Sequence, residues 1–170
     1  MSQTRAEKHE TTMVNAEPTK QHRWLQKFVG EWIYEASITE GQPSSKATGT
    51  ESVRSIKGIW IQAEADGEAP GAGHATSIMT LGYDPEKKRF IGTWIGSMMT
   101  HMWIYDGELD AAERVLTLNS EGPSMANDGT MSKYRDVIEF TDDNRRTLTA
   151  RVLEADGRWK PFMTIEFRRA

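Results

Sequence analysis

The sequence predicts an all-β protein, an antiparallel up-and-down β-barrel of about ten strands preceded by one short helix. Three observations favour this fold. Apolar and polar residues alternate with period two in successive short runs from residue 30 onward. Turn-forming pairs separate the runs and include Asp66-Gly67, Asp106-Gly107 and Asp156-Gly157. No helical pattern lies between the runs, so there is no room for the crossover helices of a parallel sheet.

The order of elements follows from these patterns. A helix is expected over residues 19–29, because Trp24, Leu25 and Phe28 share one helical face there. A turn is expected at residues 41–45, and strands at residues 30–38, 48–57, 59–68, 74–83, 89–96, 101–109, 114–121, 133–141, 146–154 and 159–168. Ten successive strands must protect their edges, and closure into a barrel does so; a two-sheet sandwich is the alternative.

Length and composition indicate one folded domain. The chain has 170 residues, of which 37% are hydrophobic and 27% charged, a profile typical of soluble globular proteins. Residues 1–17 are polar and lack an apolar face. We therefore expect a disordered or loosely packed tail over residues 1–17 and a single barrel domain over residues 18–170.

Composition also argues against several classes of function. The chain carries 21 basic and 25 acidic side chains, and this net charge of −4 argues against a nucleic-acid-binding protein. No apolar run approaches the roughly 20 residues of a membrane-spanning helix, so no membrane partner is expected. The absence of cysteine excludes disulfides and thiolate chemistry. Residues 1–20 show no apolar export signal, which predicts a cytoplasmic protein.

Alternation assigns one face of each strand to the barrel interior. The more apolar set is expected inside and includes Trp32, Tyr34, Met79, Leu81, Trp94, Met102, Ile104, Tyr134 and Ile138. Polar side chains share this parity, namely Ser52, Arg54, Asn119, Glu121, Asp136 and Glu166. Charges inside a barrel must pair, meet water or meet a ligand, because an unpaired buried charge is costly. The sequence therefore predicts a partly polar interior, and a barrel of this size can hold a small cavity.

The outer face carries a candidate apolar stripe. Ile91 and Ile95 share the outward parity of one strand, and Trp103 and Tyr105 share that of the next. Exposed apolar stripes are typical of subunit contacts. A homodimer formed through these four residues, without a ligand, is therefore one hypothesis for the function.

The start of the first strand resembles a known superfamily. A short helix runs into Gly30-Glu31-Trp32, which resembles the opening of calycin barrels such as lipocalins, fatty-acid-binding proteins and nitrobindins. In lipocalins the tryptophan of this motif plugs one end of the barrel, and an arginine near the end of the last strand stacks on it. The resemblance implies that Trp32 has this role and that Arg168 or Arg169 is the arginine.

Longer runs resemble the bacterial family known as domain of unknown function 1579. They lie at residues 51–60, 79–85, 92–101 and 134–140, and the resemblance covers about residues 20–169. It implies a lipocalin-like barrel and a bacterial source. The family brings no known activity, so function must be argued from the residues themselves.

The residues favour a barrel that binds a small apolar or amphipathic molecule without catalysing a reaction. Four side chains are expected to form the walls of this site: Tyr34, Met79, Trp94 and Tyr134. Arg54 and Asp136 are expected to orient a polar group of the ligand, and His101 is expected near the mouth. No cofactor is expected.

A further hypothesis rests on His101, which follows a methionine-rich loop. It could act as an axial haem ligand or as a general base of an enzyme. The alternative is a hydrogen-bonded histidine of a loop or of the outer face. His74 and His101 lack companion ligands at metal-binding spacing, so no metal site is expected.

Overall fold

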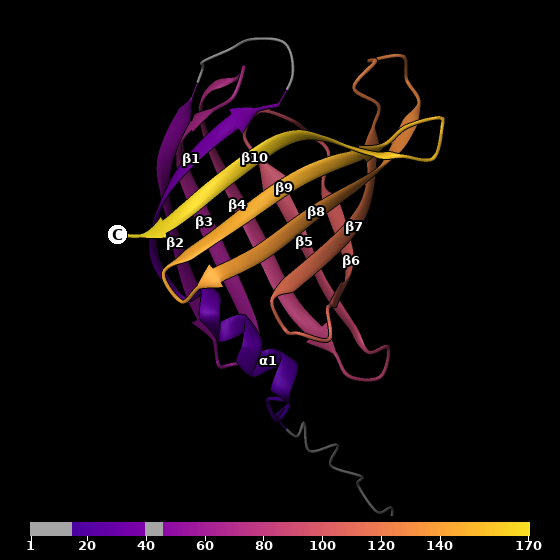
Figure 1. Cartoon of the computed structure of the whole chain (residues 1–170). Helices are drawn as coiled ribbons and strands as arrows, with labels where there is room; N and C mark the ends of the chain where they lie inside the picture. Colours follow the sequence, from indigo (N-terminus) through magenta and orange to yellow (C-terminus); the bar gives the residue numbers. More distant parts are fainter. Residues whose placement is uncertain (1–14, 40–45) are drawn as a thin grey trace, which may run out of the picture.

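Ten antiparallel strands close into a barrel in the computed structural model, which describes residues 15–39 and 46–170 (Figure 1). Each strand pairs with its neighbours in sequence, and β1 pairs with β10 to complete the ring. The strands are β1 (Gly30–Ile38), β2 (Ala47–Ile56), β3 (Trp60–Ala69), β4 (Gly73–Asp84), β5 (Arg89–Gly96), β6 (Trp103–Leu109), β7 (Val115–Pro123), β8 (Met131–Asp142), β9 (Arg145–Leu153) and β10 (Trp159–Arg169). The prediction of an all-β, up-and-down barrel is confirmed.

One helical segment precedes the barrel in the described part of the chain. It consists of α1 (Lys20–Leu25) and the 3-10 turn η1 (Gln26–Phe28). Thr19 caps α1, because its hydroxyl accepts from the backbone N–H of His22 while the His22 ring accepts from the backbone N–H of Thr19. A helix this short is not stable alone. Its position must therefore come from packing against the barrel.

Two expectations concern residues outside the described ranges. The expected turn at residues 41–45 lies outside them, and so do residues 1–14 of the expected tail. Residues 15–17 are exposed and belong to no helix or strand. Within the described ranges, no helix is both long and apolar enough to cross a bilayer.

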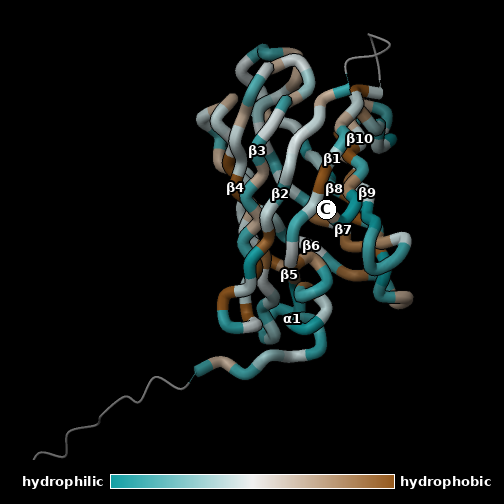
Figure 2. Tube along the Cα trace, turned by 90° about the vertical axis from the view of Figure 1, so that its left-hand side faces the viewer, coloured by the Kyte–Doolittle hydropathy of each residue, from teal (hydrophilic) through white to brown (hydrophobic). Residues whose placement is uncertain are grey.

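The helix covers one end of the barrel with an aromatic plug. Trp24, Leu25 and Phe28 are buried, as their shared helical face predicts. The rings of Trp24 and Phe28 meet Phe140 edge to face, with centroids 5.7 and 5.0 Å away. Both views of the molecule show α1 at this end (Figures 1 and 2). Burial of each large apolar side chain contributes roughly 1.5–3 kcal/mol, which holds the short helix in place.

Trp32 lies next to this plug and is fully buried. Its indole N–H donates to the carbonyl of Phe28 over 2.7 Å, which ties β1 to the helical segment. The Cζ atom of Arg169 lies 4.1 Å from the centroid of the Trp32 ring. The cation and the ring therefore attract each other at the point where the first and last strands meet.

Arg169 also fastens the last strand to the chain segment before the first strand. Its guanidinium donates to the carbonyls of Lys27 and Val29, over 2.8 and 2.6 Å. Gly30 makes room for it, because a Cβ there would collide with Nη1 of Arg169. The role that the calycin resemblance implies thus belongs to Arg169, whereas Arg168 is exposed.

Two of the predicted turns lie within strands instead. Asp66-Gly67 is part of β3, and Gly67 faces Gly49 of β2. A Cβ on Gly67 would collide with Gly49 and come within 2.8 Å of the Tyr34 hydroxyl. Asp106-Gly107 is part of β6, where Asp106 accepts two 2.9 Å hydrogen bonds from Arg89 of β5. Both pairs serve cross-strand contacts, which a local sequence pattern does not distinguish from turns.

The predicted inward parity holds on β1, β3, β4, β5, β8 and β9 but is reversed on β2 and β7. Five of the polar residues expected inside face outward: Ser52, Arg54, Asn119, Glu121 and Glu166. A shift of one residue exchanges the two faces of a strand, and β2 has few large apolar residues to fix the choice. On β7, Leu116 and Leu118 mark the inward face, which the assignment of Asn119 and Glu121 to the interior overlooks. On β10, the register shifts between Pro161 and Met163, which changes the parity within the strand.

Parity is also reversed on β6, so the predicted dimer stripe does not form. Trp103 and Tyr105 face the interior, whereas Met102 and Ile104 are 54% and 68% exposed. Apolar residues occupy both parities of this strand, and the two large aromatic residues take the buried one. Of the four stripe residues, Ile91 and Ile95 remain outside.

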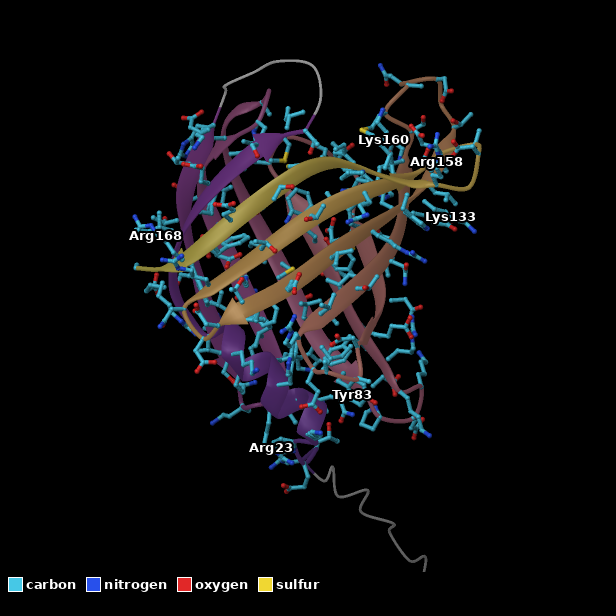
Figure 3. The ribbon with its side chains drawn as sticks, viewed as in Figure 1. Arg23, Tyr83, Lys133, Arg158, Lys160 and Arg168 are labelled. Atoms are coloured by element: carbon cyan, nitrogen blue, oxygen red, sulfur yellow. The ribbon has the colours of Figure 1, made fainter. Side chains whose placement is uncertain are left out.

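Replacement of Arg169 by methionine should lower the free energy of unfolding by about 2–4 kcal/mol, because charge-assisted hydrogen bonds and the contact with Trp32 are lost. Urea denaturation followed by tryptophan fluorescence measures this change. Arg168→Met is the matched control, since Arg168 lies on the same strand at the outer surface (Figure 3). It should change the free energy of unfolding by less than about 0.5 kcal/mol. Equal losses for the two variants would contradict the role of Arg169.

Candidate ligand-binding cavity

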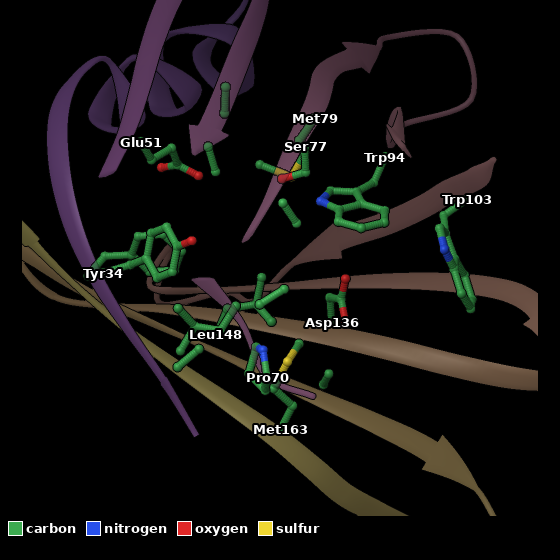
Figure 4. Close-up of a pocket in the computed structure, with 18 of the residues that line it drawn as sticks. Tyr34, Glu51, Pro70, Ser77, Met79, Trp94, Trp103, Asp136, Leu148 and Met163 are labelled. Carbon is green, nitrogen blue, oxygen red and sulfur yellow. The ribbon is translucent and has the colours of Figure 1, made fainter. Parts of the chain in front are cut away.

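The barrel interior contains a cavity of about 330 Å³ (Figure 4). Phe28 of the aromatic plug and Phe167 of β10 line its floor. Toward the opposite end, Pro70 of the β3–β4 connection and Met98 and Met99 of the β5–β6 connection line it. The cavity therefore extends from the closed end of the barrel to the loops at the other end.

Small side chains account for the empty space. Six alanines line the cavity from four strands: Ala36, Ala63, Ala65, Ala69, Ala75 and Ala150. The corresponding positions nearer the helix carry large residues, such as Leu81, Leu116 and Phe90, which are fully buried. The barrel is thus packed at its helical end and hollow beyond it.

Aromatic side chains form much of the cavity wall. Trp94 of β5 and Trp103 of β6 are direct partners across the two strands. Trp103 meets Tyr134 of β8 edge to face at 5.0 Å, and Tyr134 meets Phe162 of β10 at 6.1 Å. Figure 4 shows Trp94, Trp103 and Tyr34 around the same space. Such walls suit a flat or partly aromatic molecule.

A carboxyl group faces the middle of the cavity. Asp136 of β8 accepts a 2.5 Å hydrogen bond from the hydroxyl of Tyr105 of β6. Burial raises the pKa of Asp136 from 3.8 to about 6, although the hydrogen bond from Tyr105 opposes this change. Burial also raises the pKa of Tyr105 well above its ordinary value, and the charge of Asp136 adds to this effect. Asp136 therefore changes its protonation state at about pH 6 rather than near pH 4.

A buried ion pair lies at the floor of the cavity. Nη2 of Arg146 on β9 donates to Oε2 of Glu51 on β2, and the two side chains are only 2% and 7% exposed. The Arg146 guanidinium also lies over the rings of Trp32 and Phe167, 4.3 and 3.9 Å from their centroids. Its Nη1 atom is buried and has no hydrogen-bond partner among the described residues. The floor therefore holds a cation, Arg146, that has one N–H group without a hydrogen-bond partner among the described residues.

Five of the seven residues expected at the binding site line the cavity: Tyr34, Met79, Trp94, Tyr134 and Asp136. Arg54 does not, because it faces outward and donates to Gln62 over 2.9 Å. His101 does not line it either. Its Nε2 lies 3.0 Å from the carbonyl oxygen of Glu121, and its ring packs edge-on against Trp103.

Period-two alternation does not predict Glu51, Arg146, Trp103 or Tyr105 as cavity residues. A signal existed for Arg146, which precedes the inward residues Leu148 and Ala150 by two and four positions and shares their parity. Glu51 and Trp103 were assigned to the wrong face together with the rest of their strands. The polar group expected from Arg54 is supplied instead by Arg146.

Comparison with known proteins gives a family. The family model described as "Protein of unknown function (DUF1579)" matches residues 17–169. The chain belongs to this family. A search of the curated proteins finds no match.

Solved structures that are similar to this chain include engineered barrels. One is a redesigned beta barrel with 11% identity and a TM-score of 0.46, covering 87% of this chain and 96% of that one. Another is the redesigned beta barrel mFAP1 bound to DFHBI, with 16% identity and a TM-score of 0.45, covering 86% of this chain and 99% of that one. Similarity at this level supports no inference about a ligand.

Replacement of Asp136 by asparagine should stabilise the protein above about pH 6 and not below about pH 4. Because the folded pKa is raised, the folded state keeps a proton between these values that the unfolded state releases. Stability of the unmodified protein therefore falls as the pH rises through this window. The variant avoids this loss, which amounts to at most roughly 3 kcal/mol.

Urea denaturation at several pH values measures the difference. Asp106→Asn provides a control of opposite sign, because hydrogen bonds from Arg89 lower the pKa of Asp106. That variant should lose stability above about pH 4 rather than gain it. An Asp136→Asn effect that does not change with pH would show that the carboxyl group ionises freely in the folded protein.

Proposed function

We propose that this protein binds a small, partly apolar molecule inside its barrel and does not transform it. The observation that carries the proposal is the cavity of about 330 Å³, with aromatic walls and few polar groups. This volume falls at the small end of the roughly 300–1,000 Å³ range of ligand-binding sites. The buried polar groups Asp136 with Tyr105 and Arg146 with Glu51 give the ligand an orientation. The lining also includes Glu68, Thr76, Ser77 and Ser120.

The alanines lining the cavity support this function. A barrel selected only for stability would fill its interior, since each void the size of a methyl group or larger costs about 1 kcal/mol. Six lining alanines on four strands instead keep this space open. A bound apolar molecule would recover the contacts that these small side chains give up.

We prefer binding to the two other hypotheses for separate reasons. The homodimer hypothesis relied on Trp103 and Tyr105 at the outer face, and both line the cavity. The haem and acid–base hypotheses relied on His101, which is absent from the cavity lining. Met79, Trp94 and Tyr134, in contrast, surround the same space as expected for a ligand site.

A cavity-filling substitution tests the proposal. N-Phenylnaphthylamine is a neutral aromatic dye whose fluorescence rises in apolar surroundings, and it should bind the unmodified protein. Ala150→Phe places a ring in the middle of the cavity, where Ala150 is a lining residue. It should weaken binding of the dye by about tenfold or more, because dye and ring compete for the same space.

Thr149→Phe is the matched control. Thr149 is the preceding residue on β9 and faces the opposite side of the sheet, so the same ring is added outside the barrel. Dye affinity should then stay within about twofold of the unmodified protein. Undiminished dye binding by a folded Ala150→Phe variant would place the dye outside the cavity and refute the proposal.

A further inference from the structure

We infer that the cavity selects molecules with a carboxylate group, and that Arg146 binds this group at the floor. This inference rests on the proposed function and adds the chemical class of the ligand. The ligand group that reaches the floor then accepts a hydrogen bond from Arg146 and carries a negative charge. The apolar remainder of the ligand would then lie among Trp94, Trp103 and Tyr134.

The unpartnered Nη1 of Arg146 is the first observation. Arg146 lines the cavity although its side chain is only 2% exposed. Glu51 uses Nη2, whereas Nη1 is buried and unpaired among the described residues. A buried donor of a charged group is costly to leave without a partner. An oxygen atom of a ligand that reaches the floor would satisfy it.

The balance of charge at the floor is the second observation. Arg146 and Arg169 both lie over the ring of Trp32, at 4.3 and 4.1 Å. Glu51 pairs with Arg146, and the other polar contacts of Arg169 are neutral backbone carbonyls. Two arginines therefore lie beside one carboxylate, and of the two only Arg146 lines the cavity. A carboxylate of the ligand adds an ion pair to the hydrogen bond with Nη1 of Arg146, whereas an amide or hydroxyl group adds the hydrogen bond alone.

The buried carboxyl group of Asp136 lies far enough from the floor to leave this site undisturbed. Arg146 is in register with Phe140 on β8, and Asp136 lies four residues further along that strand. At about 3.3 Å per residue, the two positions are roughly 13 Å apart along the strand. Asp136 therefore does not oppose a carboxylate at the floor and can accept a hydrogen bond from the middle of the same ligand.

Three probes with one phenyl tail and different head groups test the inference: γ-phenylbutyrate, its amide and its alcohol. The three probes share the same apolar part. Their dissociation constants are measured by titration calorimetry near pH 7.5, where the carboxylic acid group of γ-phenylbutyrate is ionised. The carboxylate should bind about tenfold or more tightly than the amide and the alcohol, because it alone adds a negative charge to the hydrogen bond with the Arg146 guanidinium.

Substitutions at the ion pair sharpen the test. Glu51→Gln keeps an acceptor for Nη2 and removes the competing charge, so affinity for the carboxylate should rise about threefold or more. The double variant Glu51→Gln/Arg146→Met leaves no buried charge at the floor and should lose the preference for the carboxylate. Binding of N-phenylnaphthylamine by the double variant shows that its cavity is intact.

Arg151→Met is the matched control for the loss of arginine. Arg151 lies on the same strand at the opposite parity and also has a buried Nε without a partner, but it does not line the cavity. The preference of this variant for the carboxylate should equal that of the unmodified protein. A preference lost equally in Arg151→Met would assign it to overall charge and overturn the inference.

The outcomes separate this inference from the function on which it rests. Equal affinity for the three head groups, or no binding of any of them while the dye still enters the cavity, overturns the carboxylate assignment alone. If the dye also fails to bind the unmodified protein, the proposed function and the inference both fail. A tenfold preference that disappears only when Arg146 is replaced supports both.

Discussion

The contact of two arginines with one indole ring organises the closed end of this barrel. Trp32 is fully buried, and both Arg146 and Arg169 lie over it. Arg169 is held by backbone carbonyls and joins the last strand to the segment before the first. Arg146 is held by Glu51 and faces the interior. The same ring thus supports closure of the barrel on one side and the floor of the cavity on the other.

The distribution of large and small inward residues divides the barrel into two parts with different roles. Near the helix, Phe90, Leu116 and Phe140 pack with the aromatic plug and contribute to stability. Beyond it, the alanines leave the space that we propose as a binding site. Since stability and binding depend on different residues, substitutions in the hollow part can alter the ligand without loss of the fold.

Period-two alternation was sufficient to predict the fold and most of the walls, because Trp32, Met79, Trp94 and Tyr134 lie in strands with one clearly apolar face. It failed where a strand has apolar residues on both faces, as at Met102–Ile104 against Trp103–Tyr105, or few on either, as around Arg54. In such strands, pairing with the neighbouring strands determines which face is turned to the barrel interior. The Glu51–Arg146 pair joins residues 95 positions apart, so local sequence carries no signal of their contact.

Among the described residues, the aromatic plug covers one end of the cavity, and Pro70 and the methionines of the β5–β6 connection line its other end. A molecule that enters and leaves past these loops follows the same route in both directions. An obstacle at the mouth slows both by the same factor and leaves the equilibrium unchanged, whereas the floor acts on departure. In a blind-ended chamber of this kind, the exposed loops govern how quickly a molecule is exchanged, and the deep residues govern its residence time.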